Sequence, residues 1–475
     1  EEVYTIASPT SGIYGFYLDI EQGGTITKAH RAVYAKVVEG QNVEQVLHNN
    51  PYQAIDWASV NQYKSNMHTH TTQSNDPIEK FTTAYVVDCY HAAGYKILAL
   101  TDHDYCTYPW NLFPQMMSGV PARDPEALGM LAVSGNELSK DNTNSWDERT
   151  GGQFNHHNDF FTGRQGQEFA SLQESYAYTY ALGGMQIINH PGQYWNLSTT
   201  YSETEKNGPG WHATNFKTYP SLVGLEVYNQ GNRRPNDRIL WDQILERTMP
   251  ARPVFGYSGD DTHNDEQLFR NYNMMLMEEL TTEELKDAMR KGESYFCYEP
   301  KGSGEAKAPR ITNIVVDEDN KTITIEADGL VHWIYGTDMT STSASSTRSS
   351  VVGIGKTFNY TNYQGSYVRA LITNVYGETC TQPFGFVSED GTDVENVITD
   401  EQLSIVVFPN PTADQLTVFL NEVSDDETLC VYDITGKQVM RHRVEGNLTI
   451  LPVHNLTSGI YLVETGKRNA RFIKK

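Results

Sequence analysis

The sequence predicts an α/β protein that is followed by two small all-β sandwich domains. From about residue 56 to residue 298, short apolar runs rich in Val, Ile and Leu alternate with polar sites and with segments of helical period. After a Gly-, Ser-, Lys- and Pro-rich stretch at 302–309, only strand and turn patterns remain. The predicted units are an N-terminal segment of unknown role at 1–55, an α/β domain at 56–305, a β-sandwich accessory domain at 306–390, a polar acidic linker at 391–402 and a last β-sandwich at 403–475.

The α/β domain contains four apolar runs that are predicted to be buried parallel strands, at 97–100, 131–133, 185–188 and 222–225. Helices are expected at about 78–93, 167–182, 236–247 and 281–291. The last of these has a capping box of Thr281 and Glu284 at its start and Gly292 at its end. Strands that alternate with helices in this way form an α/β barrel or an open sheet.

The two β regions are predicted from shorter strands separated by turns. The first has strand patterns at 311–316, 322–326, 367–373 and 379–384, and the second has them at 403–408, 415–420, 428–432, 448–453 and 460–464. Neither region carries a helical pattern, so a small sandwich is expected in each.

Charge and composition limit what this chain can bind. Its 475 residues carry a formal net charge of −24, and a surface field of that sign repels the phosphates of long nucleic acids and of anionic lipids. No apolar run approaches the roughly 20 residues of a transmembrane helix, so no span is expected. The five cysteines are widely spaced, which argues against a disulfide framework or a thiolate zinc site.

Histidines and carboxylates gather at the ends of the apolar runs. Nine of the 14 histidines lie between residues 68 and 263, and two of them, His68 and His70, would face the same way in a strand. Singly, each side chain also reads as an ordinary hydrogen-bonding, capping or solvated group. Loops at the carboxyl ends of successive strands meet in α/β folds, however, so together these residues predict a metal-dependent hydrolase. The candidates are His68, His70, Asp102, His103, Glu137, His156, His157, His190, Asp261 and His263.

The order and spacing of these residues closely resemble the PHP family, the metal-dependent phosphoesterases named for polymerase and histidinol phosphatase domains. The matching phrases are Asn66-Met67-His68-Thr69-His70, Leu100-Thr101-Asp102-His103, Ser134-Gly135-Asn136-Glu137, Asn189-His190-Pro191 and Gly259-Asp260-Asp261-Thr262-His263. The resemblance covers about residues 56 to 300. It implies a distorted barrel of seven strands and helices that holds two or three divalent metal ions.

The resemblance also implies which side chains hold each ion. One ion would take His68, His70, Glu137 and Asp261; Glu137 would bridge to a second ion held by His156 and His190; and a third would take His103, His263 and a carboxylate after the first motif. There the chain departs from the family's pattern, because Asn75 stands where Asp is usual and Asp76 follows it. Asp76 is taken as the ligand, with Asn75 as the alternative, and His157 is read as a packing or substrate-facing residue.

Imidazole and carboxylate donors without thiolate suit Mn, Fe or Zn, and the sequence does not choose among them. The expected reaction is hydrolysis of a phosphate mono- or diester, in which the ions activate water and stabilise the phosphoryl oxygens. Asp102, Asp260, His157 and a metal-bound water are the candidates for protonating the leaving group. Arg233 and Arg234 are candidates for a phosphate clamp, because guanidinium matches phosphate bidentately, with a solvated surface position as the alternative for each.

The last segment resembles the C-terminal sorting domain of the type IX secretion system of Bacteroidota. Its phrases are Val407-Phe408-Pro409-Asn410-Pro411, Tyr432-Asp433-Ile434-Thr435-Gly436-Lys437 and Leu456-Thr457-Ser458-Gly459-Ile460-Tyr461. The resemblance implies export by the type IX secretion machinery. The expected protein is a secreted or cell-surface phosphoesterase that acts on a small-molecule or glycan-linked phosphate ester. The alternatives are a surface protein that holds metal without turnover and an exonuclease on short oligonucleotides.

Overall fold

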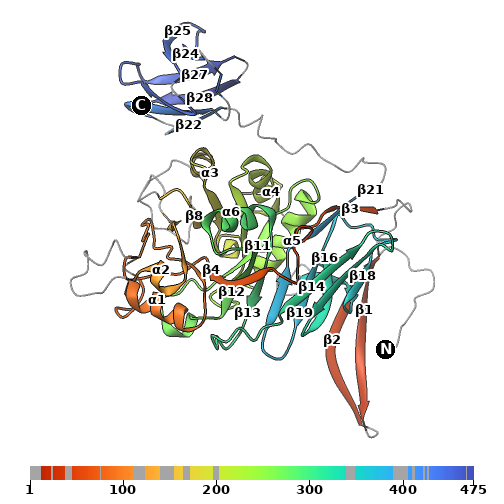
Figure 1. Cartoon of the computed structure of the whole chain (residues 1–475). Coiled ribbons are helices and arrows are strands. Elements are labelled where there is room, and N and C mark those ends of the chain that lie inside the picture. The colour runs from red at the N-terminus through yellow and green to blue at the C-terminus, as the bar shows by residue number, and fades with distance from the viewer. Residues whose placement is uncertain are drawn as a thin grey trace.

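Figure 1 shows the computed structural model of the chain. The structure describes the backbone alone at 12–22 and 25–37, and it describes residues 45–74, 76–110, 123–139, 155–163, 172–195, 203–338, 348–388, 405–408, 412–420, 423–424, 427–444, 446–466 and 468–475. Asn75, the expected linker at 391–402 and the first residues of the expected helix at 167–182 lie outside these ranges.

The α/β region is built on two hydrogen-bonded sheets. The first runs β6 (Leu131–Val133), β5 (Ile97–Ala99), β4 (Asn61–Asn66), β12 (Asn271–Met277) and β13 (Ser294–Tyr298), of which β4, β5 and β6 are parallel. The second runs β7 (Gly135–Leu138), β8 (His157–Phe160), β9 (Met185–Ile188), β10 (Leu222–Asn229) and β11 (Phe255–Gly259), of which the last three are parallel. The predicted α/β class is confirmed, whereas the closed ring of seven strands stays a prediction.

Helices accompany these strands (Figure 1). They are α1 (Thr83–Ala92), α2 (Pro125–Leu128), α3 (Leu172–Ala181), α4 (Pro209–Thr218), α5 (Asn236–Thr248) and α6 (Thr282–Lys291), with 3-10 turns η1 (Pro191–Gln193) and η2 (Asp265–Gln267). Helix α6 begins and ends where expected, because the Thr281 side chain accepts from the backbone N–H of Glu284 and Gly292 adopts φ 72°. The expected capping box is only half formed, since the Glu284 carboxylate accepts from the backbone N–H groups of Glu278 and Glu279 and not from that of Thr281. Helix α4 was not predicted; its Pro209 stands at the first turn, where a missing N–H costs no helical hydrogen bond.

The sheet of the following β region continues the first α/β sheet. Its strands are β14 (Ile311–Asp317), β15 (Thr322–Ala327), β16 (Leu330–Asp338), β17 (Arg348–Ile354), β18 (Thr357–Asn359), β19 (Tyr367–Thr373), β20 (Glu378–Thr381) and β21 (Phe384–Ser388). Strand β20 pairs antiparallel with β13, so the order β17-β16-β19-β20 runs on into β13-β12-β4-β5-β6. Strands β14, β15 and β18 form a smaller sheet. Main-chain hydrogen bonds thus join the two regions, which the sequence pattern did not indicate.

The N-terminal segment also attaches to this body. Strands β1 (Gly12–Gln22) and β2 (Thr25–Val37) form an antiparallel hairpin, and β3 (Gln45–Asn49) pairs with β21. Tyr52 follows β3 and is buried. Its hydroxyl donates to the carbonyl of Ser294 at 2.9 Å and accepts from the backbone N–H of Gln382 at 2.8 Å. One side chain therefore bonds to both the α/β region and the β region.

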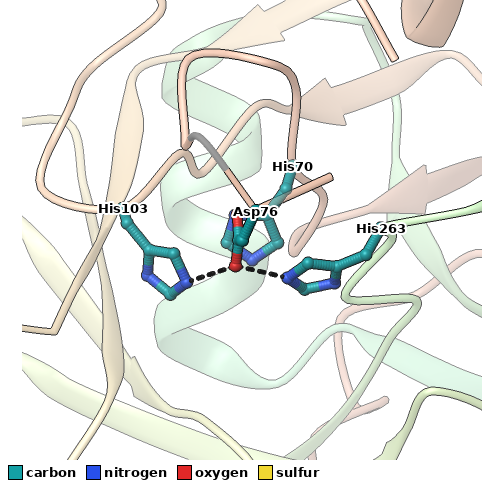
Figure 2. Close-up of side chains that lie close together, drawn as sticks. All are labelled: His70, Asp76, His103 and His263. Carbon is teal, nitrogen blue, oxygen red and sulfur yellow. Dashed lines mark hydrogen bonds and ion pairs between the residues drawn. The ribbon is translucent and has the colours of Figure 1, made fainter. Parts of the chain in front are cut away.

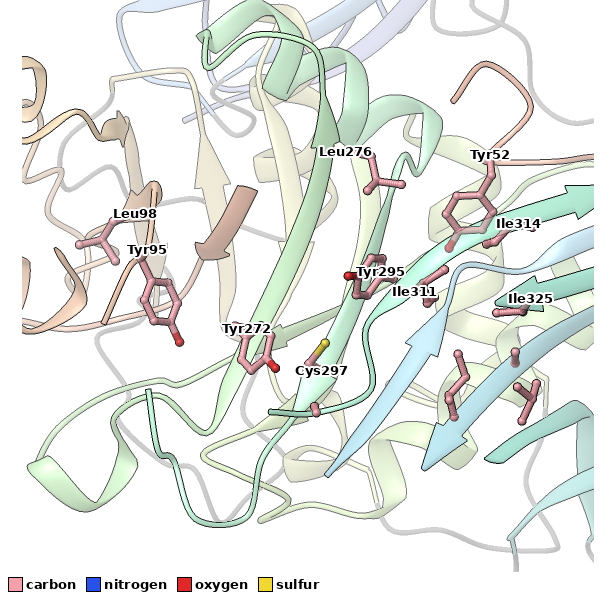
Figure 3. Close-up of a cluster of buried hydrophobic side chains, with 14 of the residues drawn as sticks. Tyr52, Tyr95, Leu98, Tyr272, Leu276, Tyr295, Cys297, Ile311, Ile314 and Ile325 are labelled. Atoms are coloured by element: carbon pink, nitrogen blue, oxygen red, sulfur yellow. The ribbon is translucent and has the colours of Figure 1, made fainter. Parts of the chain in front are cut away.

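One hydrophobic core extends from the α/β strands into the β region (Figure 3). Its buried side chains include Tyr95, Leu98, Tyr272, Leu276, Tyr295, Ile311, Ile314 and Ile325. A buried ion pair adds a polar fastening, because Arg369 on β19 donates from Nε and Nη2 to the two carboxylate oxygens of Asp242 on α5, each at 2.7 Å. The two regions therefore pack as one unit.

The C-terminal segment is a sandwich with a core of its own. Its strands are β22 (Ile405–Phe408), β23 (Gln415–Leu420), β24 (Thr428–Asp433), β25 (Gln438–Arg443), β26 (Leu448–Pro452), β27 (Gly459–Thr465) and β28 (Arg468–Lys474), in sheets ordered β22-β23-β26 and β25-β24-β27-β28. The basic end of the chain forms β28, where Phe472 is buried and stacks on Tyr461. Among the residues described, no helix has the length and apolar character that a membrane span requires.

Candidate metal centre

Glu137 lies at the centre of the predicted ligands. It belongs to β7 and is 1% exposed. Its Oε2 lies 3.4 Å from His68 Nε2, 3.2 Å from His70 Nε2 and 3.1 Å from His103 Nδ1, and its Oε1 lies 3.1 Å from His156 Nδ1 and 3.3 Å from His190 Nε2. One carboxylate thus contacts five histidines that come from four separate parts of the sequence.

His68, His70 and Asp261 complete the innermost group with Glu137. His68 Nε2 and His70 Nε2 are 3.2 Å apart. Asp261 Oδ1 lies 3.1 Å from His70 Nε2 and 3.5 Å from His68 Nε2. All four residues are buried, and each offers one ligand atom within 4.8 Å of the others. The expectation that both histidines lie in a strand is wrong, because β4 ends at Asn66 and both are in the loop that follows.

Hydrogen bonds at the other ring nitrogens orient these two imidazoles. His68 Nδ1 lies 2.8 Å from Glu226 Oε1, and His70 Nδ1 lies 2.9 Å from Ser74 Oγ. A carboxylate partner holds the proton on Nδ1 and leaves Nε2 as the donor atom for a cation. Neither Glu226 nor Ser74 was predicted as a site residue; the available signal for Glu226 was its place directly after the apolar run at 222–225.

Asp76 joins His103 and His263 beside His70. Its Oδ2 lies 3.3 Å from His103 Nε2 and 2.8 Å from His263 Nε2, and Figure 2 shows this carboxylate between the two rings. These four residues form a second compact group of ligand atoms. Asp76 therefore lies in the cluster, and its alternative Asn75 lies outside the described residues.

His103, Glu137 and His156 form a third compact group. The family resemblance pairs His156 with His190, and the rings of these two residues lie 5.3 Å apart. The geometry also brings His103 within reach of both Glu137 and Asp76. Every side chain predicted as a metal ligand is thus found in one place.

The carboxylates of the cluster favour positive charge among them. Burial opposes charge on His70, but hydrogen bonds to Asp261 and Glu137 outweigh it and raise the pKa of His70 to about 10. Burial likewise opposes charge on Glu137, yet the attraction of His68, His156 and His103 holds its pKa well below the usual range. A divalent cation supplies this charge without protonating the ligands.

The backbone approaches the cluster closely at Gly259, the last residue of β11. A Cβ there would lie 2.0 Å from Glu226 Oε1 and 2.8 Å from His68 Cβ, so only glycine fits. Asp261 adopts φ 46° and His190 adopts φ 28°, which are costly conformations for residues with a side chain. Such strain persists where surrounding structure enforces it, and it concentrates at functional sites.

A pocket of about 350 Å³, open to solvent, is lined by all members of the cluster except His68 and His70, which lie beneath it. The same pocket is lined by Arg233, Arg234, Gln193, Gln230 and Gln267. Arg233 is exposed and Arg234 is half-buried, so the pocket lining brings both arginines to the cluster and leaves the phosphate clamp a prediction. The three glutamines were not predicted, because no motif in the sequence marks them.

Asp102 lies outside this pocket and holds the loop at 71–74. Its Oδ1 accepts from the backbone N–H of Thr71 at 2.6 Å and from Ser74 Oγ at 3.0 Å, and its Oδ2 accepts from Thr107 Oγ1 at 2.6 Å. Ser74 in turn contacts His70. We therefore revise the prediction that Asp102 protonates the leaving group, because its oxygens are occupied and buried.

Asp260 and His157 also lie outside the pocket. Asp260 accepts from the hydroxyl of Tyr90 at 2.8 Å and from the backbone N–H of Asn271 at 2.7 Å, which fixes the loop after β11. His157 is fully buried, and its Nε2 lies 2.9 Å from Ser175 Oγ. Their predicted roles as proton donors are revised in the same way, and His157 has the packing role that was its alternative.

The donor set fits divalent metal ions. Nitrogen and oxygen atoms converge in three overlapping groups, of which one is fully buried. In that group the oriented Nε2 atoms of His68 and His70 meet two carboxylate oxygens. Such donors suit Mn, Fe or Zn, and the geometry does not distinguish these metals or fix the number of ions. The fold and the site thus define an α/β protein with a candidate metal centre.

Comparison with known families identifies the last segment. Residues 406–475 match the family described as the secretion system C-terminal sorting domain. This match confirms the expected sorting domain and indicates type IX export to the cell surface or beyond it. The curated proteins contain no sequence that matches this chain.

Comparison with solved structures finds weak similarities, among them those to the following two proteins. A two-domain protein from Bacteroides vulgatus that contains a predicted PHP-like metal-dependent phosphoesterase is 15% identical, with 73% of this chain and 100% of that chain covered and a TM-score of 0.35. The lesion-specific endonuclease Q from Pyrococcus furiosus is 15% identical, with 48% and 56% covered and a TM-score of 0.31. TM-scores this low do not establish a shared fold, so the case for the site stands on its geometry.

Proposed function

We propose that this protein is a secreted metal-dependent phosphoesterase. The observation that carries the proposal is a single pocket lined by histidine and carboxylate ligands together with Arg233 and Arg234. Ligands of this kind suit several hydrolases. Guanidinium groups at the same pocket add a match to phosphate, because their donors pair with two phosphate oxygens at once.

The proposed ligand sets follow the compact groups. His68, His70, Glu137 and Asp261 would hold one ion; Glu137 would reach a second with His156 and His190; and Asp76, His103 and His263 would hold a third. Bound divalent ions supply a water that is nucleophilic near neutral pH and positive charge for the phosphoryl oxygens.

The remaining side chains bind and orient the ester. Arg233 and Arg234 take the phosphate oxygens and turn the phosphorus toward the cluster. Asp102 and Asp260 keep the ligand-bearing loops in place through the hydrogen bonds described above. Because these two carboxylates and His157 lie outside the pocket, solvent in the open pocket is the proton donor for the departing group.

The proposed substrate is a small-molecule or glycan-linked phosphate ester. A pocket of about 350 Å³ accommodates a small ligand or the end of a larger one. The net charge of −24 opposes binding of a long polynucleotide.

Elemental analysis and turnover of purified wild-type protein test the proposal. The substrates are p-nitrophenyl phosphate, bis(p-nitrophenyl) phosphate and a dinucleotide. We expect wild-type protein to contain divalent metal and to hydrolyse an ester, and we expect His68→Ala and Asp261→Asn to lose metal and turnover together. His91→Ala, an exposed histidine of α1, is the matched control and keeps both.

Three results would contradict the proposal. Full metal content and turnover in either ligand variant would remove the assigned ligand roles. Bound metal without hydrolysis of any substrate would favour a metal-containing surface binding protein. Turnover of the dinucleotide alone would favour an exonuclease.

A further inference from the structure

Gln230 connects a proposed metal ligand to a proposed phosphate-binding arginine. Its side-chain nitrogen donates to Asp261 Oδ2 at 3.1 Å and to the carbonyl of Asp261 at 3.1 Å. Its side-chain oxygen accepts from Arg233 Nη1. Gln230, Asp261 and Arg233 all line the same pocket. One amide therefore bridges a carboxylate and a guanidinium at the site.

The backbone at Gln230 is strained in the same manner as at two proposed ligands. Gln230 follows β10 with φ 45°, beside φ 46° at Asp261 and φ 28° at His190. Residues with a side chain avoid this region, so its use at three strand ends around one pocket indicates a functional constraint. Gln230 is the one of the three that is not a proposed ligand.

The chemistry of the amide explains why glutamine suits this position. A carboxylate and a guanidinium placed together form a bidentate ion pair, which would occupy the Asp261 oxygens and neutralise Arg233. A neutral amide satisfies each group with its own half, because it donates to the carboxylate and accepts from the guanidinium. The positive charge of Arg233 is thereby held near the cluster without being paired to it.

A second glutamine and arginine make a similar contact at the same pocket. Arg234 donates from Nη2 to the Gln193 side-chain oxygen at 2.8 Å, and both residues line the pocket. Gln193 comes from η1, directly after His190. This pair supplies a matched comparison, because it holds an arginine in the same way through a different part of the chain.

We propose that Gln230 is a positioning residue that holds Arg233 toward the phosphoryl group of the substrate and keeps that guanidinium off Asp261. The proposal rests on the proposed phosphoesterase function. If it is correct, Gln230 affects the affinity of the protein for phosphate and does not affect its metal content.

A double-mutant cycle on metal-loaded, full-length protein tests this role. The variants are Gln230→Ala, Arg233→Met and the pair together, and the measurements are KM and kcat for p-nitrophenyl phosphate, inhibition by inorganic phosphate and metal content. We expect Gln230→Ala to weaken phosphate binding and to raise KM by about tenfold, because that is the change in affinity that corresponds to one lost hydrogen bond to a charged group. Metal content should be unchanged. In the Arg233→Met background, Gln230→Ala should have no further effect.

Gln230→Glu sharpens the same test, because it preserves size and replaces the donor with a negative charge. The new carboxylate would pair with Arg233 and repel Asp261, so phosphate affinity should fall by more than in Gln230→Ala. Gln193→Ala is the comparison: its effect should persist in the Arg233→Met background and disappear in the Arg234→Met background.

Additive effects of Gln230→Ala and Arg233→Met would overturn the proposal. Loss of metal in Gln230→Ala would also overturn it, because the residue would then serve Asp261 alone. Equilibrium binding of inorganic phosphate to the metal-loaded protein keeps the two proposals separable: if no ester is hydrolysed, the proposed function fails, while the dependence of phosphate binding on Gln230 and Arg233 is still measured.

Discussion

The ion pair of Asp242 with Arg369 and the cluster around Glu137 both bring charged side chains together, but they serve different purposes. Asp242 and Arg369 are at most 1% exposed, and their two hydrogen bonds of 2.7 Å match a carboxylate to a guanidinium directly. The cluster around Glu137 brings histidines and several carboxylates together, and it lines a pocket open to solvent. A buried carboxylate that meets a cationic side chain of the same chain fastens two elements together. A group of carboxylates with too little positive charge around it forms a place for a metal cation.

The first way to test this comparison is to break the closed pair. Arg369→Met leaves the Asp242 carboxylate buried without its cation, and we expect a loss of about 3–5 kcal/mol in the free energy of unfolding. The measurement is denaturant unfolding of purified protein. Folded Arg369→Met should retain the wild-type metal content.

The double variant Asp242→Leu/Arg369→Met is the control for this loss. It removes both charges, so it should recover most of the stability that the single variant loses. A single variant that loses less than about 1 kcal/mol would show that the pair is not the fastening between α5 and β19 that its burial indicates.

The second prediction concerns the open cluster. Glu137→Gln keeps the shape of the side chain but removes the charge that faces five histidines. We expect metal affinity to fall by more than about a hundredfold, beyond the range for outer partners of a metal site, with the fold retained. Metal titration followed by elemental analysis measures this change.

Glu203→Gln serves as the control for the loss of one carboxylate, because Glu203 is exposed and pairs with Arg247 at the surface. It should bind metal as wild type does. Wild-type metal affinity in Glu137→Gln would remove Glu137 from the centre of the site.

The third prediction uses a buried histidine outside both clusters. Burial lowers the pKa of His212 on α4 to about 3, whereas carboxylate contacts raise that of His70 to about 10. Because the folded state holds His212 neutral while the unfolded state protonates it near pH 6.5, its contribution to stability is complete above pH 6.5 and is lost as the pH falls toward 3.

Replacing His212 by Phe removes this titration. Between pH 6.5 and 4.5, the stability of His212→Phe should fall less steeply than that of wild type, by about 1.4 kcal/mol per pH unit. Denaturant unfolding at several pH values measures both slopes. Equal slopes in the two proteins would show that His212 does not titrate differently on unfolding.

The sequence predicted which histidines and carboxylates gather in space better than it predicted their surroundings. His103, Glu137, His190 and Asp261 each follow or end an apolar run, and residues at strand ends meet in space whatever the details of the loops. Asp76 was taken as a ligand from its place after the first motif, with Asn75 as the alternative; its Oδ2 lies 2.8 Å from His263 Nε2, whereas Asn75 lies outside the described residues.

The sequence did not predict the proton donors, because that role depends on the direction in which each side chain points. Asp102, Asp260 and His157 stand beside ligands in the sequence, yet each turns to backbone or side-chain partners outside the pocket. Neighbouring residues in a loop take different directions, so proximity in sequence does not assign a side chain to a pocket. Gln230 shows the converse, because its strained backbone, invisible in the sequence, turns an unremarkable amide toward Asp261.

By itself, the sequence determined the α/β class, the sorting domain at its end and the set of side chains able to bind metal, because these depend on periodicity, composition and local motifs. The tertiary structure alone decided that β20 extends the sheet of β13, that Asp242 meets Arg369, and that Gln193 meets Arg234 at the pocket. These contacts link residues distant along the chain, and their formation depends on how whole elements pack, which no local pattern of residues records.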